Sequence, residues 1–95
     1  MPQQVPYWDA LIVGTCDEGG SCGVQQRTGP YNEAPRKYSN DLKDGMTVSV
    51  VCQTIGDTRS SEGHGSSSIW YRLVNGAYVS SVYTNLTAPL GMPTC

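Results

Sequence analysis

Two runs of β-branched and aromatic residues near the C-terminus give the clearest pattern in the chain. Ile69–Val74 and Ala77–Val82 flank Asn75-Gly76, and residues that tolerate positive φ between such runs favour a tight primed turn that matches strand twist. The pattern therefore predicts a β-hairpin. Because neighbouring side chains of a strand point to opposite faces, Trp70 and Tyr71 are expected on opposite sides. One face can then fill a core while the other keeps the indole available.

The rest of the chain adds shorter strands joined by turns. Met46 to Cys52 alternates apolar and polar positions, which predicts a half-buried strand, and the short apolar run Ala10 to Val13 is expected to add an edge strand. Val24 to Arg27 alternates weakly before the break at Gly29-Pro30. Gly56 to Ser68 is rich in Ser and Gly and has no periodicity, so it is expected to be a flexible connection between strands.

Composition limits the fold class. The chain has 95 residues, 38% of them hydrophobic and none of them Phe, with 11 Gly and 6 Pro. A domain of this size has a small core and usually needs crosslinks, and so many Gly and Pro residues interrupt long helices. We therefore expect a single all-β domain with many turns.

The charge and hydropathy patterns argue against nucleic acids and membranes as partners. The formal net charge is -2 and the basic residues are scattered, so no patch has the electrostatic footprint of a nucleic-acid-binding protein. No apolar run reaches the roughly 18 residues typical of a membrane helix. We expect a soluble protein that binds neither nucleic acid nor membrane and needs no cofactor.

The four cysteines are Cys16, Cys22, Cys52 and Cys95. An even number in a short chain indicates two disulfides and an oxidising compartment. Three pairings are possible. Five residues separate Cys16 from Cys22, so a local bridge forms easily there and leaves Cys52 and Cys95 to join a mid-chain strand to the last residue. Metal ligation is the competing interpretation, but the sequence has no C-x2-C pair and only one histidine.

The ends of the chain suggest how the domain is organised. Residues 1–13 contain two prolines and two glutamines near the start and are interpreted as a linker or N-terminal arm of a larger parent protein, with the domain over residues 14–95. The beginning has no apolar segment of the kind found in secretion signals, so a signal is expected to have been removed or to be absent from this sequence. Met1 is then a candidate expression start.

Three separate stretches resemble the bacterial Src-homology-3 domain family, in the form found in actinobacterial secreted proteins and phage lysins. The first is Val24–Tyr31 (V-Q-Q-R-T-G-P-Y), the second runs from Asp44-Gly45 through Val51, and the third is the W-Y-R-L, N-G, Y-V and Y series from Trp70 to Tyr83. Together they cover about residues 24–86. The resemblance implies a small, strongly bent barrel of five to seven short strands.

The same resemblance assigns the loops and the crosslinks. It implies a long first loop over Tyr31–Asn40 and a second loop over Thr54–Ser68. The cysteine pattern looks like that of a disulfide-bearing subgroup, which implies the bridges Cys16–Cys22 and Cys52–Cys95. The chain departs from the family at Gln26, where an apolar residue is more usual, and in the length of the second loop.

By resemblance, the ligand groove lies between these two loops. Trp70 and Tyr83 match the groove positions best, with Tyr31 and Tyr38 contributing from the first loop and Asn32 orienting a peptide at the rim. Exposed aromatic rings suit peptide or glycan ligands, because they bury area at little rotamer cost and their polar tips can hydrogen-bond. The alternative is that these rings complete a small core that lacks Phe.

The expected function is that of a non-catalytic, cell-wall targeting module that binds the peptide or glycan part of peptidoglycan. Such a module belongs to a secreted, cell-wall-associated or phage-encoded protein. The alternative is a structural or protein–protein interaction domain of a secreted adaptor, surface or virion assembly. An enzyme is not expected, because the single histidine, His64, lies in a Gly/Ser segment that would not hold a base beside a nucleophile.

Overall fold

The computed structural model of the chain describes residues 7–16, 23–38, 41–61, 65–86 and 92–95. They form one antiparallel sheet with the strand order β1-β2-β3-β4. Its strands are β1 (Trp8–Leu11), β2 (Thr47–Ser61), β3 (Gly65–Leu73) and β4 (Tyr78–Ser80), followed by the 3-10 turn η1 (Ser81–Tyr83). The mostly β character expected from the sequence is confirmed. Among the described residues, no helix is long and apolar enough to span a bilayer.

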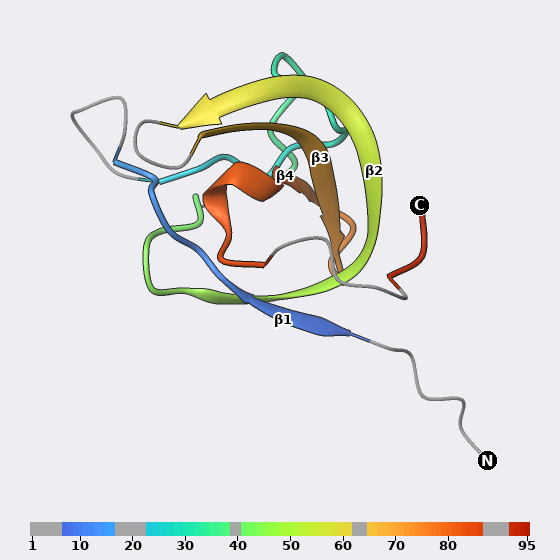
Figure 1. The fold of residues 1–95 in the computed structure, drawn as a ribbon, viewed down its shortest axis with the longest axis horizontal. Helices are drawn as coiled ribbons and strands as arrows, with labels where there is room; N and C mark the ends of the chain where they lie inside the picture. The colour runs from blue at the N-terminus through green and yellow to red at the C-terminus, as the bar shows by residue number, and fades with distance from the viewer. Residues whose placement is uncertain (1–6, 17–22, 39–40, 62–64, 87–91) are drawn as a thin grey trace.

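β2 is the longest strand, and it curves around the molecule as an arc with β3 along its inner side (Figure 1). The pairing of β2 with β3 shifts register twice, between Val50 and Cys52 and between Ile55 and Arg59. Irregularities of this kind bend a strand and increase its twist. The bends allow a single sheet to curl around one core.

The Ser-rich stretch after Thr54 is mostly strand, so the prediction of a flexible connection over Gly56–Ser68 is wrong for the residues described. β2 continues to Ser61 and β3 starts at Gly65, with Arg59 opposite Ser67. The side chains of this part of the ladder are exposed or half-buried. A strand with solvent near both faces needs no apolar–polar alternation, so the sequence carried no strand signal there.

The predicted hairpin between β3 and β4 is confirmed, but its turn differs from the expected one. The N–H of Leu73 donates to Ala77 O at 2.8 Å and encloses the loop Val74–Gly76. Gly76 has a φ of 89°, whereas none of the described non-glycine residues has a positive φ. A primed two-residue turn of the Asn-Gly type needs positive φ at both positions. Asn75 instead supports the longer loop through its side chain, which accepts from the N–H of Ala77 at 2.9 Å.

The core is built around the aromatic side chains of β3. Its main cluster contains Ala10, Ile12, Val24, Leu42, Val50, Tyr71, Leu73, Val79, Val82, Tyr83 and Met92. Tyr71 is fully buried in this cluster, and its hydroxyl donates to Leu86 O at 3.0 Å. Trp70 lies outside the cluster and is nevertheless only 1% exposed. The sheet is therefore covered on both faces at this point of β3.

β1 lies within the segment that the sequence suggested as a linker or arm. It pairs with β2, from Trp8 opposite Val50 to Leu11 opposite Thr47, and Ala10 belongs to the main core cluster. The segment thus takes part in the sheet from Trp8 on.

The stretch Val24–Arg27, which alternates weakly in the sequence, forms only isolated bridges. Val24 pairs with Leu42, and Arg27 pairs with both Arg36 and Tyr78. The described sheet has four strands, and further isolated bridges join Ile12 to Thr84 and Gln53 to Thr94. The resemblance implied a barrel of five to seven strands. The break at Gly29-Pro30 limits the pairing, because proline fixes φ and has no N–H to donate.

The disulfide between Cys52 and Cys95 is confirmed. It attaches the end of the chain to β2, where Gln53 forms a parallel bridge with Thr94. The N–H of Gln53 donates to Pro93 O at 3.0 Å, and the N–H of Cys95 donates to Gln53 O at 2.8 Å. The other predicted bridge includes Cys22, which lies outside the described residues.

Replacing both Cys52 and Cys95 with serine is expected to lower the free energy of unfolding by about 4 kcal/mol, the chain-entropy value for a loop of this length. The sequence separation is 43 residues, so the crosslink removes much of the freedom of the unfolded chain. Urea unfolding of both proteins under non-reducing conditions measures the difference. Equal midpoints and equal slopes would contradict the expectation.

Candidate functional site

The five predicted ligand residues lie in two separate places. Asn32 and Tyr83 meet at Arg59 of β2, and Trp70 is bonded to the neighbouring Asp57. Tyr38 instead contacts the turn between β3 and β4. Tyr31, which adjoins Asn32 in the first loop, is 55% exposed.

Hydrogen bonds attach the first loop to the second bend of β2. The N–H of Asn32 donates to Asp57 Oδ2 at 3.0 Å, and the N–H of Asp57 donates to Pro30 O at 3.1 Å. The side-chain amide of Asn32 also donates to Thr58 O at 3.1 Å. The loop approaches so closely that a Cβ on Gly56 would lie 1.9 Å from Pro30 O. Only glycine fits at this contact.

Arg59 covers the predicted aromatic platform. Its Nε donates to the hydroxyl of Tyr83 at 3.2 Å, and its guanidinium carbon lies 5.4 Å from the centre of the Tyr83 ring. Its Nη1 donates to Asn32 Oδ1 at 3.2 Å. A stacked guanidinium is attracted by the ring face. Arg59 therefore joins the first loop to the core and stands where a ligand was expected.

The expectation that Trp70 and Tyr83 form an exposed shelf is wrong. They are 1% and 2% exposed, and the indole N–H of Trp70 donates to Asp57 O at 2.8 Å. A chain without Phe fills its interior with amphipathic rings whose polar tips need buried or local partners. Both residues instead fit the alternative interpretation, in which these rings complete the core.

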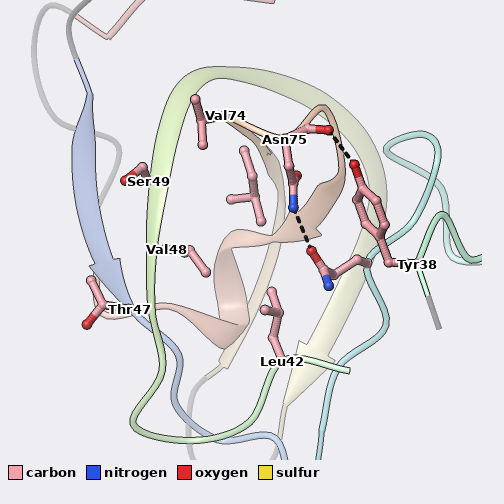
Figure 2. Close-up of a pocket in the computed structure, with 9 residues that line it drawn as sticks. Tyr38, Leu42, Thr47, Val48, Ser49, Val74 and Asn75 are labelled. Carbon is pink, nitrogen blue, oxygen red and sulfur yellow. Dashed lines mark hydrogen bonds between the residues drawn. The ribbon is translucent and has the colours of Figure 1, made fainter. Parts of the chain in front are cut away.

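An open groove lies on another part of the molecule, under the curve of β2 (Figure 2). Its volume is about 470 Å³, and the described residues that line it are Gln26, Tyr38, Leu42, Thr47, Val48, Ser49, Leu73, Val74 and Asn75. Figure 2 shows Leu42 and Val48 pointing into it, with Tyr38 closing one side. None of these lining residues is charged.

The rim of the groove is held in place by hydrogen bonds. The hydroxyl of Tyr38 donates to Asn75 O at 2.8 Å, and Asn75 Nδ2 donates to Gln26 Oε1 at 3.0 Å. Both bonds are drawn in Figure 2. Gln26 is 3% exposed, so it is a buried amide that supports the turn. The Lys37 ammonium lies 5.8 Å from the centre of the Tyr38 ring.

Of the five predicted ligand residues, Tyr38 alone lines this groove. Val48 lies in the strand predicted over Met46–Cys52, and Asn75 lies in the predicted tight turn. No sequence signal joins them, because the groove is built from four segments that only the fold brings together.

The described residues contain no group of three or more His, Cys, Asp or Glu residues that could hold a metal ion. His64 and Glu62 lie outside the described residues. The uncharged groove can bury an apolar group and exchange hydrogen bonds at its rim, which is the chemistry of recognition.

A second, smaller hollow lies beside the C-terminal tail. Its volume is about 240 Å³, and it is lined by Gln53, Thr54, Ile55, Ile69 and Thr94. Ile55 is 68% exposed, the largest value among the exposed large hydrophobic residues described. An apolar side chain in this position is available to a protein partner.

Replacing Gly56 with alanine is expected to lower the free energy of unfolding by about 3 kcal/mol, the upper part of the range for overpacking. The new methyl group would meet the Pro30 carbonyl, a backbone atom that a rotamer change cannot move. Gly45→Ala is the matched control, because Gly45 has no neighbour within 4 Å of the added atom and carries only the strain of its φ of 89°. A smaller loss at Gly56 than at Gly45 would contradict the close contact.

The burial of Trp70 can be measured by fluorescence. The chain has two tryptophans, so Trp8→Phe leaves Trp70 as the single emitter. Its emission is expected to be blue-shifted and several-fold less sensitive to acrylamide than in the unfolded chain, because water cannot reach a ring that is 1% exposed. Emission of the folded variant at the wavelength of free indole would contradict this placement.

No family model matches the chain, and no curated protein matches it either.

Proposed function

We propose that the chain is a non-catalytic recognition module that binds the peptide or glycan part of peptidoglycan and holds a secreted or phage-encoded protein at the bacterial cell wall. The proposal includes the bacterial Src-homology-3 relationship suggested by the sequence, with its barrel and the Cys16–Cys22 bridge. The Cys52–Cys95 disulfide fits the oxidising surroundings of such a protein.

The open groove of about 470 Å³ is the observation that carries the proposal. Its lining mixes apolar and polar groups. The half-buried Val48 and the exposed Val74 offer area for a sugar ring or an aliphatic peptide side chain. Tyr38 and Asn75 give it a polar rim that is fixed by their mutual hydrogen bond. A groove that combines apolar area with oriented polar groups suits a sugar or peptide ligand.

The roles of the five sequence-predicted residues change accordingly. Tyr38 is the proposed ligand contact, since it is 36% exposed and lines the groove. Trp70, Tyr83 and Asn32 support the fold, because their polar groups are bonded to Asp57 and Arg59. Tyr31 remains an exposed ring without a place in the groove.

Binding to purified bacterial cell walls tests the proposal. The isolated protein is expected to leave the supernatant when the walls are pelleted, and Val74→Asp is expected to weaken this binding at least tenfold, or about 1.4 kcal/mol. Val74 lines the groove and is 57% exposed, so the added charge reaches the ligand without entering the core. Tyr38→Ala is expected to weaken binding by a similar factor.

Ile55→Asp is the matched control, because Ile55 is even more exposed and lies outside the groove. The groove proposal fails if the unchanged protein stays in the supernatant at every salt concentration tried. It also fails if Val74→Asp and Ile55→Asp bind walls equally well.

A protein–protein interaction domain is the second candidate function, and the exposed Ile55 beside Ile69 favours it. In that case Ile55→Asp, and not Val74→Asp, is expected to abolish association with the parent assembly. The two aspartate variants therefore separate the candidate functions.

A further inference from the structure

One cross-strand row of the sheet gathers three of the four arginines of the chain. Arg72 of β3 is directly opposite Tyr78 of β4. Tyr78 is also opposite Arg27, which is in turn opposite Arg36. Residues directly opposite each other in an antiparallel pair have their side chains on the same face. These four residues therefore form a single row, the arginine row, from segments that are far apart in the sequence.

The arginine row lies on the face of the sheet that points away from the main core cluster. Tyr71 and Val79, the strand neighbours of the row, belong to that cluster, and successive side chains of a strand point to opposite faces. The row is exposed at its two ends, Arg72 and Arg36, and half-buried between them. None of its residues lines the groove.

The arginines of the row differ in their contacts. Nη1 of Arg27 donates to Ala34 O at 2.9 Å, which holds this guanidinium beside the first loop. Nη2 of Arg36 lies 3.3 Å from Asp41 Oδ1, so a carboxylate offsets part of the charge at this end. The exposed side chain of Arg72 has neither a hydrogen bond nor an ion pair within the described part of the chain. Arg72 is therefore ready to receive an added carboxylate.

Charge decides what kind of ligand fits the arginine row. A guanidinium pairs with a carboxylate through two parallel hydrogen bonds, which favours anionic groups. A long polyanion such as a nucleic acid would extend past the row over a chain whose net charge is -2, and it would meet Asp41 at one end. A short segment with a few carboxylates avoids both sources of repulsion.

The length of the row matches an extended peptide. Adjacent strands lie about 4.8 Å apart, so the row spans about 14 Å from Arg72 to Arg36. An extended peptide rises about 3.3 Å per residue and directs alternate side chains to one face, so its first, third and fifth side chains span about 13 Å. Three carboxylates on one peptide can then face the row at the same time.

We propose that the arginine row binds a short, extended acidic segment of another protein, with Asp or Glu at alternate positions facing the arginines. The segment would run across the strands of the sheet. Tyr78, half-buried between the arginines, adds apolar area and a hydroxyl to the same surface. This site lies apart from the groove and does not depend on wall binding.

Titration of the ¹⁵N-labelled chain with the peptide Ac-Glu-Ser-Glu-Ser-Glu-NH₂ tests this site. The amide signals of Arg72 and Tyr78 are expected to shift in a saturable way. The same peptide with glutamine in place of glutamate is expected to bind at least about tenfold more weakly, because three exposed ion pairs are lost. Raising NaCl from about 20 mM to about 500 mM is expected to weaken binding several-fold by screening. Equal binding of the two peptides, or tighter binding of inorganic polyphosphate than of the Glu peptide, would overturn the proposal.

Variants of the chain locate the binding surface. Arg72→Gln is expected to weaken binding of the Glu peptide about threefold to fivefold, as for an exposed ion pair. Lys37→Gln is the matched control, because Lys37 is an exposed cation next to Arg36 whose side chain points to the opposite face by strand alternation. It is expected to bind the peptide as the unchanged protein does. Equal losses in the two variants would contradict the proposed row.

A change that strengthens binding separates recognition from a purely structural role of the arginines. Asp41→Asn is expected to bind the Glu peptide about twofold more tightly, because Arg36 loses the carboxylate that competes for it. Tyr38→Ala is expected to keep full peptide binding, which distinguishes this site from the groove. Weaker peptide binding in either variant would overturn the proposal.

Discussion

The close approach of the first loop to β2 is the constraint on which the rest of the structure depends. Pro30 O occupies the space where any side chain at position 56 would begin, so Gly56 lets the loop lie against the bend of the strand. The backbone of Asp57 then serves two partners, the carbonyl of Pro30 and the indole of Trp70. With the loop in place, Arg59 bridges it to the core. Because Gly56 has no side chain, the first loop can lie where Asp57 and Arg59 connect it to Trp70 and Tyr83.

The absence of phenylalanine explains why the buried rings carry polar groups that need partners. Interior rings that carry a hydroxyl or an indole N–H need a hydrogen-bond partner when buried, and Tyr71, Trp70 and Tyr83 have theirs in Leu86 O, Asp57 O and Arg59. These bonds hold the edges of the core together. Tyr38 differs because its hydroxyl is bound to the turn at Asn75 while its ring remains at the groove.

The features predicted from the sequence are those that depend on residues close together in the chain. The β3–β4 hairpin and the start of β2 follow from local patterns, and the Cys52–Cys95 bridge follows from pairing the two nearby cysteines first. The extension of β2 to Ser61 was missed, since a solvated strand has no periodicity. The burial of Trp70 was missed because alternation says which face a ring points to but not what covers that face. The groove was missed because its walls come from segments far apart in the chain.

The Cys52–Cys95 crosslink also determines how the chain would carry a mechanical load. Tension applied between β1 and the last residue would pass from Cys52 across the sulfur atoms to Cys95. The intervening residues, which include β3 and β4, would bear no pulling force while the bond is intact. The β3–β4 hairpin is therefore shielded from stretching, and only the part of the chain before Cys52 would extend.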